Sequence, residues 1–267
     1  MKPVDFGYAR PATIAGALHL LAGDPGARII GGGQTLGPML NLRLARPSLL
    51  VDITRIPELV RIEETAGAVT LGAGITHAAI EDGRVPDFTN GYLAHVARGI
   101  AYRAVRNRGT IGGSLANGDP AADWIAAFAA LGAEALIEGV KGSRSVGILA
   151  FVKGAMLTDL AHDEMLSGVR IPRPGAGARW GYHKICRKTG EFAEAIGVVV
   201  DMGSGQFRAI AGATGAAPIA IELNRDTADI GACRQALADA AYKADDYDMQ
   251  IHAVALARAF AAANANR

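Results

Sequence analysis

The stretch ARIIGGGQTL, residues 27–36, joins a short apolar strand to three consecutive glycines, a glutamine and a threonine. A second turn of the same kind, TIGGS at residues 110–114, follows later in the chain. Glycine lets a backbone turn sharply, and it lets a ligand approach the amides without a Cβ in the way. Both turns therefore predict a binding site for phosphate.

Helix ends add to this prediction. If helices begin at Leu36 and Leu115, their free N–H groups and positive dipole ends favour an anion by roughly 0.3–1 kcal/mol each. The hydroxyls of Thr35 and Ser114 add further donors. We therefore expect a cofactor whose diphosphate is held from two sides by the two turns.

A dinucleotide site of the Rossmann type is an alternative interpretation of the first turn. Gly31, Gly33 and Gly37 fit its loose glycine pattern, and Asp52 stands where an acidic ribose ligand is expected. However, Leu36 occupies the third-glycine position of the tighter fingerprint, and the chain up to Leu49 leaves room for only a short helix. A structural role for Asp52 is favoured, and the absence of Gly-Lys-Ser/Thr excludes a P-loop.

Composition excludes several other classes of protein. The 267 residues carry a formal charge of +1, which gives no basic surface for nucleic acid or an anionic membrane. The N-terminal residues show no signal peptide, and no apolar run is long enough to span a membrane, so a cytoplasmic location is expected. Two distant cysteines, Cys186 and Cys233, and six scattered histidines predict no metal site on this chain.

The pattern of strands, helices and Pro/Gly turns divides the chain into three predicted domains, residues 1–55, 56–174 and 175–267. The first reads as a compact α/β unit and the second as short strands and helices around the second turn. The third reads as three antiparallel strands, at about 180–187, 196–202 and 207–213, followed by two alanine-rich helices. A further piece of sheet is expected at 148–153.

No side chain is assigned a catalytic role, since nothing marks an activated nucleophile. The carboxylate of Asp123 is suited to accept hydrogen bonds from sugar-like hydroxyls, whereas Asp119 fits a cap and turn before a helix at Trp124 as well as it fits a binding role. Arg103, Arg106 and Arg108 could steer phosphate or bind a partner, and a solvated edge explains them as well. All six histidines are interpreted as structural.

Four ordered stretches resemble a known family. They are IGGGQTLGPMLNLRLARPSLLVD at 30–52, VRNRGTIGGSLANGDPAAD at 105–123, DEMLSGVRIP at 163–172 and YHKICRKTGEFA at 182–193. Together they closely resemble the FAD-binding medium subunit of molybdenum hydroxylases, the family of carbon monoxide and xanthine dehydrogenases. The resemblance covers nearly the whole chain.

The resemblance implies an α+β protein with an FAD-binding fold of the vanillyl-alcohol-oxidase type, built from two α/β subdomains, and a separate C-terminal domain. Carried over by position, it places Asp123 at the sugar or ribityl part of FAD and Lys184 at the polar edge of the flavin, where a cation favours the reduced form. Ile100 and Leu166 would pack near the adenine or isoalloxazine rings. The diphosphate would contact Ile29, Ile30, Gly31, Gly32, Gly33, Gln34, Thr35 and Leu36 on one side, and Thr110, Ile111, Gly112, Gly113 and Ser114 on the other.

The resemblance also implies a relay. A large partner subunit would hydroxylate an N-heterocycle, aldehyde, purine or CO at a molybdenum-pterin centre. Electrons would then pass through two [2Fe-2S] clusters of a small subunit to FAD on this chain and on to an external acceptor, in a dimer of heterotrimers. Two alternatives remain, a stand-alone flavin- or NAD-dependent oxidoreductase with its own substrate pocket and a non-catalytic dinucleotide-binding module.

Overall fold

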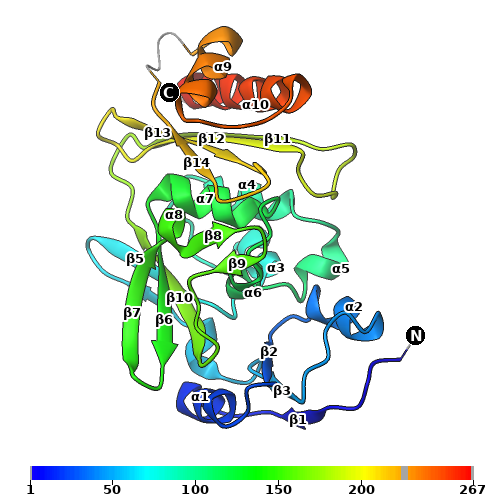
Figure 1. Cartoon of the computed structure of the whole chain (residues 1–267). Coiled ribbons are helices and arrows are strands. Elements are labelled where there is room, and N and C mark those ends of the chain that lie inside the picture. Colours follow the sequence, from blue (N-terminus) through cyan, green and yellow to red (C-terminus); the bar gives the residue numbers. More distant parts are fainter. Residues whose placement is uncertain (1, 224–227, 266–267) are drawn as a thin grey trace.

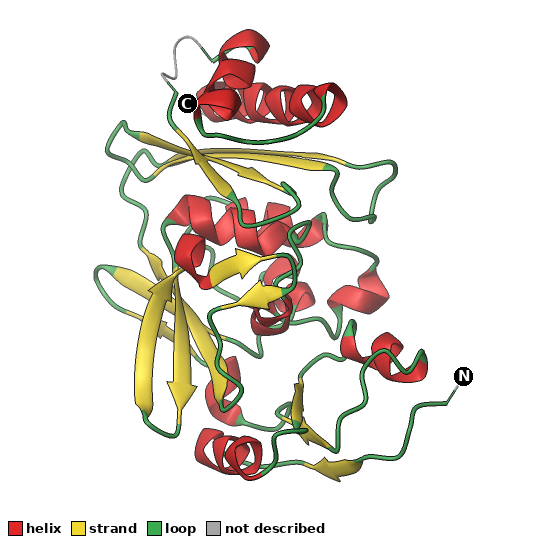
Figure 2. Cartoon of the chain, in the orientation of Figure 1, coloured by secondary structure: helices red, strands yellow, loops and turns green. Residues whose placement is uncertain are grey.

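The computed structural model describes residues 2–223 and 228–265 as a stack of three sheets with helices between and above them. The N-terminal residues form the bottom of the view in Figure 1, and the C-terminal sheet and its helices form the top. Figure 2 shows the same arrangement by type of element. The helices are α1 Ile14–Gly23, α2 Leu36–Asn41, α3 His77–Glu81, α4 Tyr92–Arg98, α5 Arg103–Arg106, α6 Ile111–Asn117, α7 Asp123–Leu131, α8 Ile148–Phe151, α9 Ile230–Asp239 and α10 Asp246–Ala265, with a 3-10 turn at Pro57–Val60.

The N-terminal sheet is small and parallel, in the order β1-β3-β2. Its strands are β1 Gly7–Ala9, β2 Arg28–Ile30 and β3 Leu49–Asp52. Helix α1 begins after Thr13, whose hydroxyl accepts from the Gly16 N–H and satisfies one of the free amides of the first helical turn. Strand β2 ends at the first glycine turn, and the six-residue α2 begins at Leu36, which confirms the predicted start.

The middle sheet is antiparallel, in the order β4-β5-β10-β6-β7. Its strands are β4 Ile62–Glu64, β5 Ala68–Gly72, β6 Glu134–Gly139, β7 Gly142–Gly147 and β10 Glu164–Pro172, and a separate hairpin pairs β8 Val152–Gly154 with β9 Leu157–Thr158. The prediction of sheet throughout 148–153 is wrong in its first half, because Ile148–Phe151 forms helix α8 with its apolar side chains in the core. The β6–β7 hairpin was not predicted, since most of β7 is polar and solvent-facing.

The C-terminal sheet has four antiparallel strands, not the three that were predicted. They are β11 Arg179–Ile185, β12 Ala195–Asp201, β13 Phe207–Gly212 and β14 Ile219–Ile221. The fourth strand was not predicted, because three residues show too little alternation of apolar and polar side chains to be distinguished from a loop. Helix α10 packs on β11 and β12 so closely that a Cβ at Gly197 would lie 2.4 Å from the Ala255 carbonyl oxygen, which explains the glycine in the strand and the alanines in the helix.

Helix α7 lies between the C-terminal sheet and the rest of the molecule, and all nine of its residues are buried. Trp124 and Phe128 stack on this helix with ring centroids 5.0 Å apart. One continuous hydrophobic core extends from Ala17 near the N-terminus to Ile210 in β13. Each sheet draws its strands from one predicted domain range, while the boundaries near residues 55 and 174 remain predictions.

Candidate functional site

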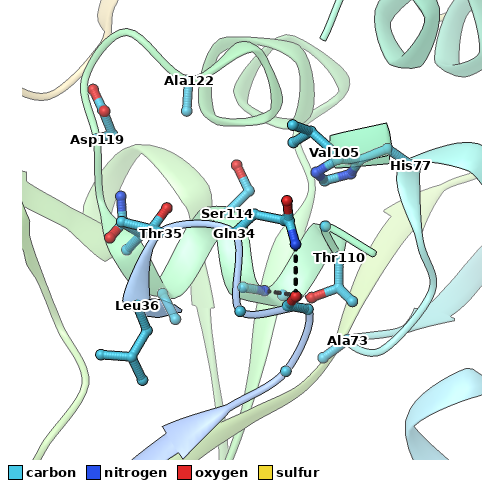
Figure 3. Close-up of a pocket in the computed structure, with 18 of the residues that line it drawn as sticks. Gln34, Thr35, Leu36, Ala73, His77, Val105, Thr110, Ser114, Asp119 and Ala122 are labelled. Carbon is cyan, nitrogen blue, oxygen red and sulfur yellow. Dashed lines mark hydrogen bonds between the residues drawn. The ribbon is translucent and has the colours of Figure 1, made fainter. Parts of the chain in front are cut away.

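A cavity of about 430 Å³ opens where the N-terminal sheet meets the middle sheet and the end of β11. It is lined by the first glycine turn, by the second turn and the start of α7, by β10, and by the loop after β11. Figure 3 shows Gln34, Thr35 and Ser114 around the cavity, with the ring of His77 pointing toward it. Its volume is within the ordinary range for small-molecule and cofactor sites.

The first glycine turn presents a run of free backbone donors to this cavity. Among the described residues, none accepts a hydrogen bond from the amides of Gly31 to Thr35, although each of these residues lines the cavity. Gly33 has φ +71°, a conformation that L side chains rarely adopt. Consecutive backbone N–H groups in such a turn form a concave site for anions.

The second turn differs from the first because its amides are already used. The N–H groups of Ile111 and Gly112 donate to the carbonyls of Ile75 and Ala73, and those of Gly113 and Ser114 donate to Thr110. Thr110 caps α6, so this helix begins at Ile111 and the predicted start at Leu115 is wrong. The second turn therefore offers the cavity side-chain hydroxyls, from Thr110 and Ser114, in place of backbone amides.

Helices α2 and α6 contain six and seven residues, so the expected contribution of their dipoles to anion binding is small.

The two turns touch each other directly. The Arg108 Nε donates to the Gly32 carbonyl at 3.2 Å, and a Cβ at Gly32 would lie 1.9 Å from the Arg108 carbonyl oxygen. The side chain of Gln34 also donates to the Gly32 carbonyl, at 3.0 Å. The turns thus form one continuous wall, and the glycine at position 32 is explained by this contact and not by a ligand.

A buried ion pair closes another part of the cavity. The Lys184 Nζ lies 3.1 Å from Asp123 Oδ2, and the Tyr182 hydroxyl donates to Asp123 Oδ1 at 2.6 Å. Burial raises the pKa of Asp123, while Lys184 and Tyr182 oppose that shift. The positive charge of Lys184 is therefore balanced within the protein, which the sequence did not reveal.

Of the seventeen residues predicted to bind a cofactor, sixteen line this one cavity. Ile111 does not, because its side chain is fully buried beneath the second turn. The sixteen are Ile29, Ile30, Gly31, Gly32, Gly33, Gln34, Thr35, Leu36, Ile100, Thr110, Gly112, Gly113, Ser114, Asp123, Leu166 and Lys184. Lining residues that were not predicted include Ala73, His77, Ala101, Gly109, Met165 and Phe192. No local sequence signal distinguishes them, since they reach the cavity only through the tertiary fold.

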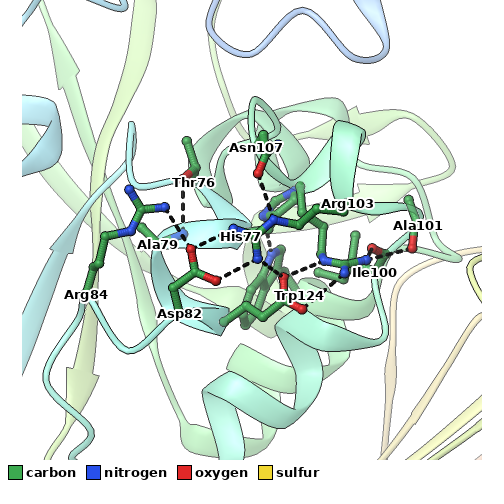
Figure 4. A network of polar contacts seen from close by, with 12 residues as sticks. Thr76, His77, Ala79, Asp82, Arg84, Ile100, Ala101, Arg103, Asn107 and Trp124 are labelled. Atoms are coloured by element: carbon green, nitrogen blue, oxygen red, sulfur yellow. Dashed lines mark hydrogen bonds and ion pairs between the residues drawn. The ribbon is translucent and has the colours of Figure 1, made fainter.

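The arginines before the second turn brace the cavity wall. Arg106 forms an ion pair with Glu81 and donates to the carbonyls of Ile100 and Ala101, which line the cavity. Figure 4 shows the neighbouring Arg103 between Asp82 and Asn107. Arg106 is largely buried, so of the interpretations left open, a solvated edge is wrong for this residue, and internal pairing explains it.

Two acidic residues left open by the sequence have structural partners. Asp52 is buried and accepts hydrogen bonds from the backbone N–H and hydroxyl of Thr54 and from the Tyr8 hydroxyl. The favoured structural role of Asp52 is therefore confirmed, and its carboxylate is not free to bind a ribose. Asp119 accepts from the Ala121 N–H and shapes the turn before α7, whose first residue is Asp123. In residues 2–223 and 228–265, no three His, Cys, Asp or Glu side chains gather as metal ligands would.

These features fit the diphosphate of a dinucleotide cofactor. A run of unpartnered amides, hydroxyls from the facing turn and apolar walls such as Ile100 and Leu166 suit a ligand with a charged centre and flat ring systems at its ends. The short α2, the small three-stranded parallel sheet and the antiparallel character of the other sheets exclude a Rossmann unit. The fold and the cavity thus define a cofactor-binding α+β protein outside the Rossmann class.

Comparison with known proteins identifies the family. Residues 4–174 match the family described as "FAD binding domain in molybdopterin dehydrogenase". The nicotine 6-hydroxylase medium subunit of Paenarthrobacter nicotinovorans is 36% identical over 231 residues, which are 86% of this chain and 81% of that protein. The carbon monoxide dehydrogenase structure from Hydrogenophaga pseudoflava superposes with a TM-score of 0.90 at 34% identity, covering 100% of this chain and 99% of that one. Quinoline 2-oxidoreductase from Pseudomonas putida 86 gives a TM-score of 0.88 at 32% identity, covering 100% and 99%.

The chain belongs to this FAD-binding family of molybdopterin dehydrogenases. The predicted α+β FAD-binding fold, the FAD cofactor and the assignment as an oxidoreductase subunit of the molybdenum hydroxylase type are confirmed. The family's relatives are medium subunits of multi-subunit enzymes. None of the helices in the described part of the chain has the length and apolar character needed to cross a membrane.

Proposed function

We propose that this chain holds FAD in the cavity and relays electrons within a three-subunit enzyme. It takes them from [2Fe-2S] clusters of a small subunit, after a large subunit has hydroxylated its substrate at a molybdenum-pterin centre, and delivers them to an external acceptor. When bound, FAD supplies a redox centre that accepts and releases electrons either in pairs or singly. The chain itself binds, orients and shields that centre.

The observation that carries this proposal is the run of free amides from Gly31 to Thr35. The five residues line the cavity and their amides have no acceptor among the described residues, so a bound diphosphate would satisfy these donors. The hydroxyls of Thr110 and Ser114 complete the set from the second turn.

The remaining predicted residues have supporting geometry. Asp123 and Lys184 meet as a buried pair, so they present polar groups to the sugar or flavin while adding little net charge. Any effect of Lys184 on the flavin potential is that of an ion pair and is smaller than that of a lone cation. Ile100 and Leu166 provide apolar walls for the ring systems.

The proposed assembly follows from which cofactors this chain can and cannot hold. This chain has too few cysteines to bind an iron–sulfur cluster with four thiolates, so the clusters belong to a partner. A dimer of heterotrimers in the cytoplasm, reducing an external acceptor, is the arrangement we propose.

The test is to add FAD to the purified full chain, remove unbound flavin by gel filtration and record the visible spectrum. Retained flavin bands, with no reduction when an N-heterocycle, aldehyde, purine or CO is added to this chain alone, support the relay. Reduction of the bound flavin by such a substrate in the isolated chain would instead indicate a self-contained oxidoreductase. A folded chain that retains NAD but no flavin would indicate a dinucleotide-binding module.

A further inference from the structure

His77 is a buried histidine with one ring nitrogen unused by the protein. Its side chain is 5% exposed, it begins α3, and it lines the cavity beside the second glycine turn. The Trp124 Nε1–H donates to His77 Nδ1 at 3.0 Å. No hydrogen-bond partner of His77 Nε2 is found in the described parts of the chain.

Trp124 fixes the position of the proton on the imidazole. An indole nitrogen can only donate, so His77 Nδ1 must accept and the ring proton must reside on Nε2. Burial and the nearby Arg106 lower the pKa of His77 to about 4, which keeps the ring neutral near pH 7. His77 therefore carries one N–H donor of fixed orientation, held by the fully buried Trp124.

The Nε2–H donor of His77 lies close to the first glycine turn. A Cβ on Gly109 would lie 2.8 Å from His77 Nε2, and a Cβ on Gly32 would lie 2.9 Å from the Gly109 Cα. Gly109 thus lies next to both the imidazole edge and Gly32, so Nε2 is close to the first turn. Nε2 is not fully enclosed by protein atoms, and the ring of His77 lies at the wall of the cavity (Figure 3).

We propose that His77 binds the cofactor directly, donating a hydrogen bond from Nε2–H to a diphosphate oxygen of FAD, with Trp124 as the positioning residue that sets its tautomer. The inference rests on the proposed function, since it takes FAD as the ligand of the cavity. A purely structural histidine needs only the bond from Trp124, and it does not explain why the second nitrogen faces the cavity unpartnered. The structure thus adds a side-chain donor to the amides of the first turn.

The test measures FAD affinity by the quenching of flavin fluorescence, using the full chain after its own flavin has been removed. His77→Leu keeps the bulk and removes the donor, and we expect the Kd for FAD to rise about tenfold or more, as for the loss of one hydrogen bond to a charged oxygen. His77→Gln retains an N–H donor and should stay within about threefold of the wild type. His19→Leu, an exposed histidine on α1, serves as the control and leaves the Kd unchanged.

Two further measurements separate a binding role from a structural one. Trp124→Phe preserves the stacking on Phe128 but frees the tautomer, so it should weaken FAD binding by a smaller factor than His77→Leu. Competition by ADP, which carries the diphosphate without flavin, should weaken by the same factor as FAD in His77→Leu. Equal FAD affinity in folded wild type and His77→Leu, or loss of FAD affinity with no change for ADP, would overturn the proposal. Failure of the folded wild type to bind FAD at all would instead overturn the proposed function.

Discussion

The two glycine turns look alike in the sequence and differ in how they use their backbones. In the first turn, Gly31 to Thr35 line the cavity and their amides have no acceptor among the described residues, whereas in the second turn the amides of Ile111 to Ser114 are all bonded within the protein. Glycine at 112 is required because Ala73 packs against it, with a hypothetical Cβ only 2.7 Å from the Ala73 carbonyl oxygen. The same motif thus leaves its backbone amides free for the proposed ligand in one place and serves close packing in the other.

The largest loss of stability and FAD binding is expected from a substitution at Gly32, where the two turns touch. Gly32→Ala places a Cβ 1.9 Å from the Arg108 carbonyl oxygen, which forces the two backbones apart. We expect the free energy of unfolding to fall by about 3 kcal/mol or more, and FAD binding to be lost. Urea unfolding and flavin retention measure both effects.

Gly37→Ala is the matched control for this substitution, because a Cβ there would have no described atom within 4 Å. Gly37 lies inside α2, so alanine should leave FAD binding intact and raise stability by up to about 1 kcal/mol. Comparable damage from both substitutions would contradict the contact between the turns as the cause.

A substitution in the second turn should reduce stability more than it reduces FAD affinity. Gly112→Ala brings a Cβ against Ala73, and we expect a loss of about 1–3 kcal/mol in the free energy of unfolding. Since the Gly112 amide already donates to Ala73, the Kd for FAD of the folded fraction should change by less than about threefold. A large loss of affinity at full stability would show that the second backbone also binds the ligand.

The first turn should give the opposite result. A Cβ on Gly31 would have only the Thr110 Oγ1 within 4 Å among described atoms, at 3.6 Å, so the fold accommodates alanine at this position. The methyl group enters the cavity, and we expect FAD affinity to fall about tenfold, with the free energy of unfolding unchanged within about 0.5 kcal/mol. Unchanged affinity would argue against diphosphate binding at this turn.

The smallest expected effect is a pH dependence of stability from His77, whose ring lies next to Gly109, the residue before the second turn. Its pKa is lowered to about 4 in the folded chain, from a usual value of 6.5, so the unfolded chain binds more protons between these values and stability falls as the pH drops. From pH 7.5 to pH 6 this amounts to about 0.8 kcal/mol. His77→Gln should remove that part of the slope, whereas His19→Gln, on an exposed histidine, should keep it.

Much of the site was predictable because the motifs are local. The strand before Gly31 and the start of α2 follow from an apolar run and from glycine, whose effects extend over a few residues. Strands β7 and β14 were not predicted, because a polar strand or a three-residue strand is stabilised mainly by pairing with adjacent strands and carries little signal of its own. Asp123 was indicated by its carboxylate, whereas Leu166 and Lys184 were indicated only by the resemblance to a family.

By itself, the sequence determined the family, the two glycine turns and the absence of a four-cysteine cluster site, since each depends on residue types in a fixed order. Only the tertiary structure decided which amides stay free, that Lys184 is paired with Asp123, and that His77 turns an unpartnered nitrogen toward the cavity. A backbone group is free or bonded according to what packs against it, and that partner is supplied by distant segments of the chain.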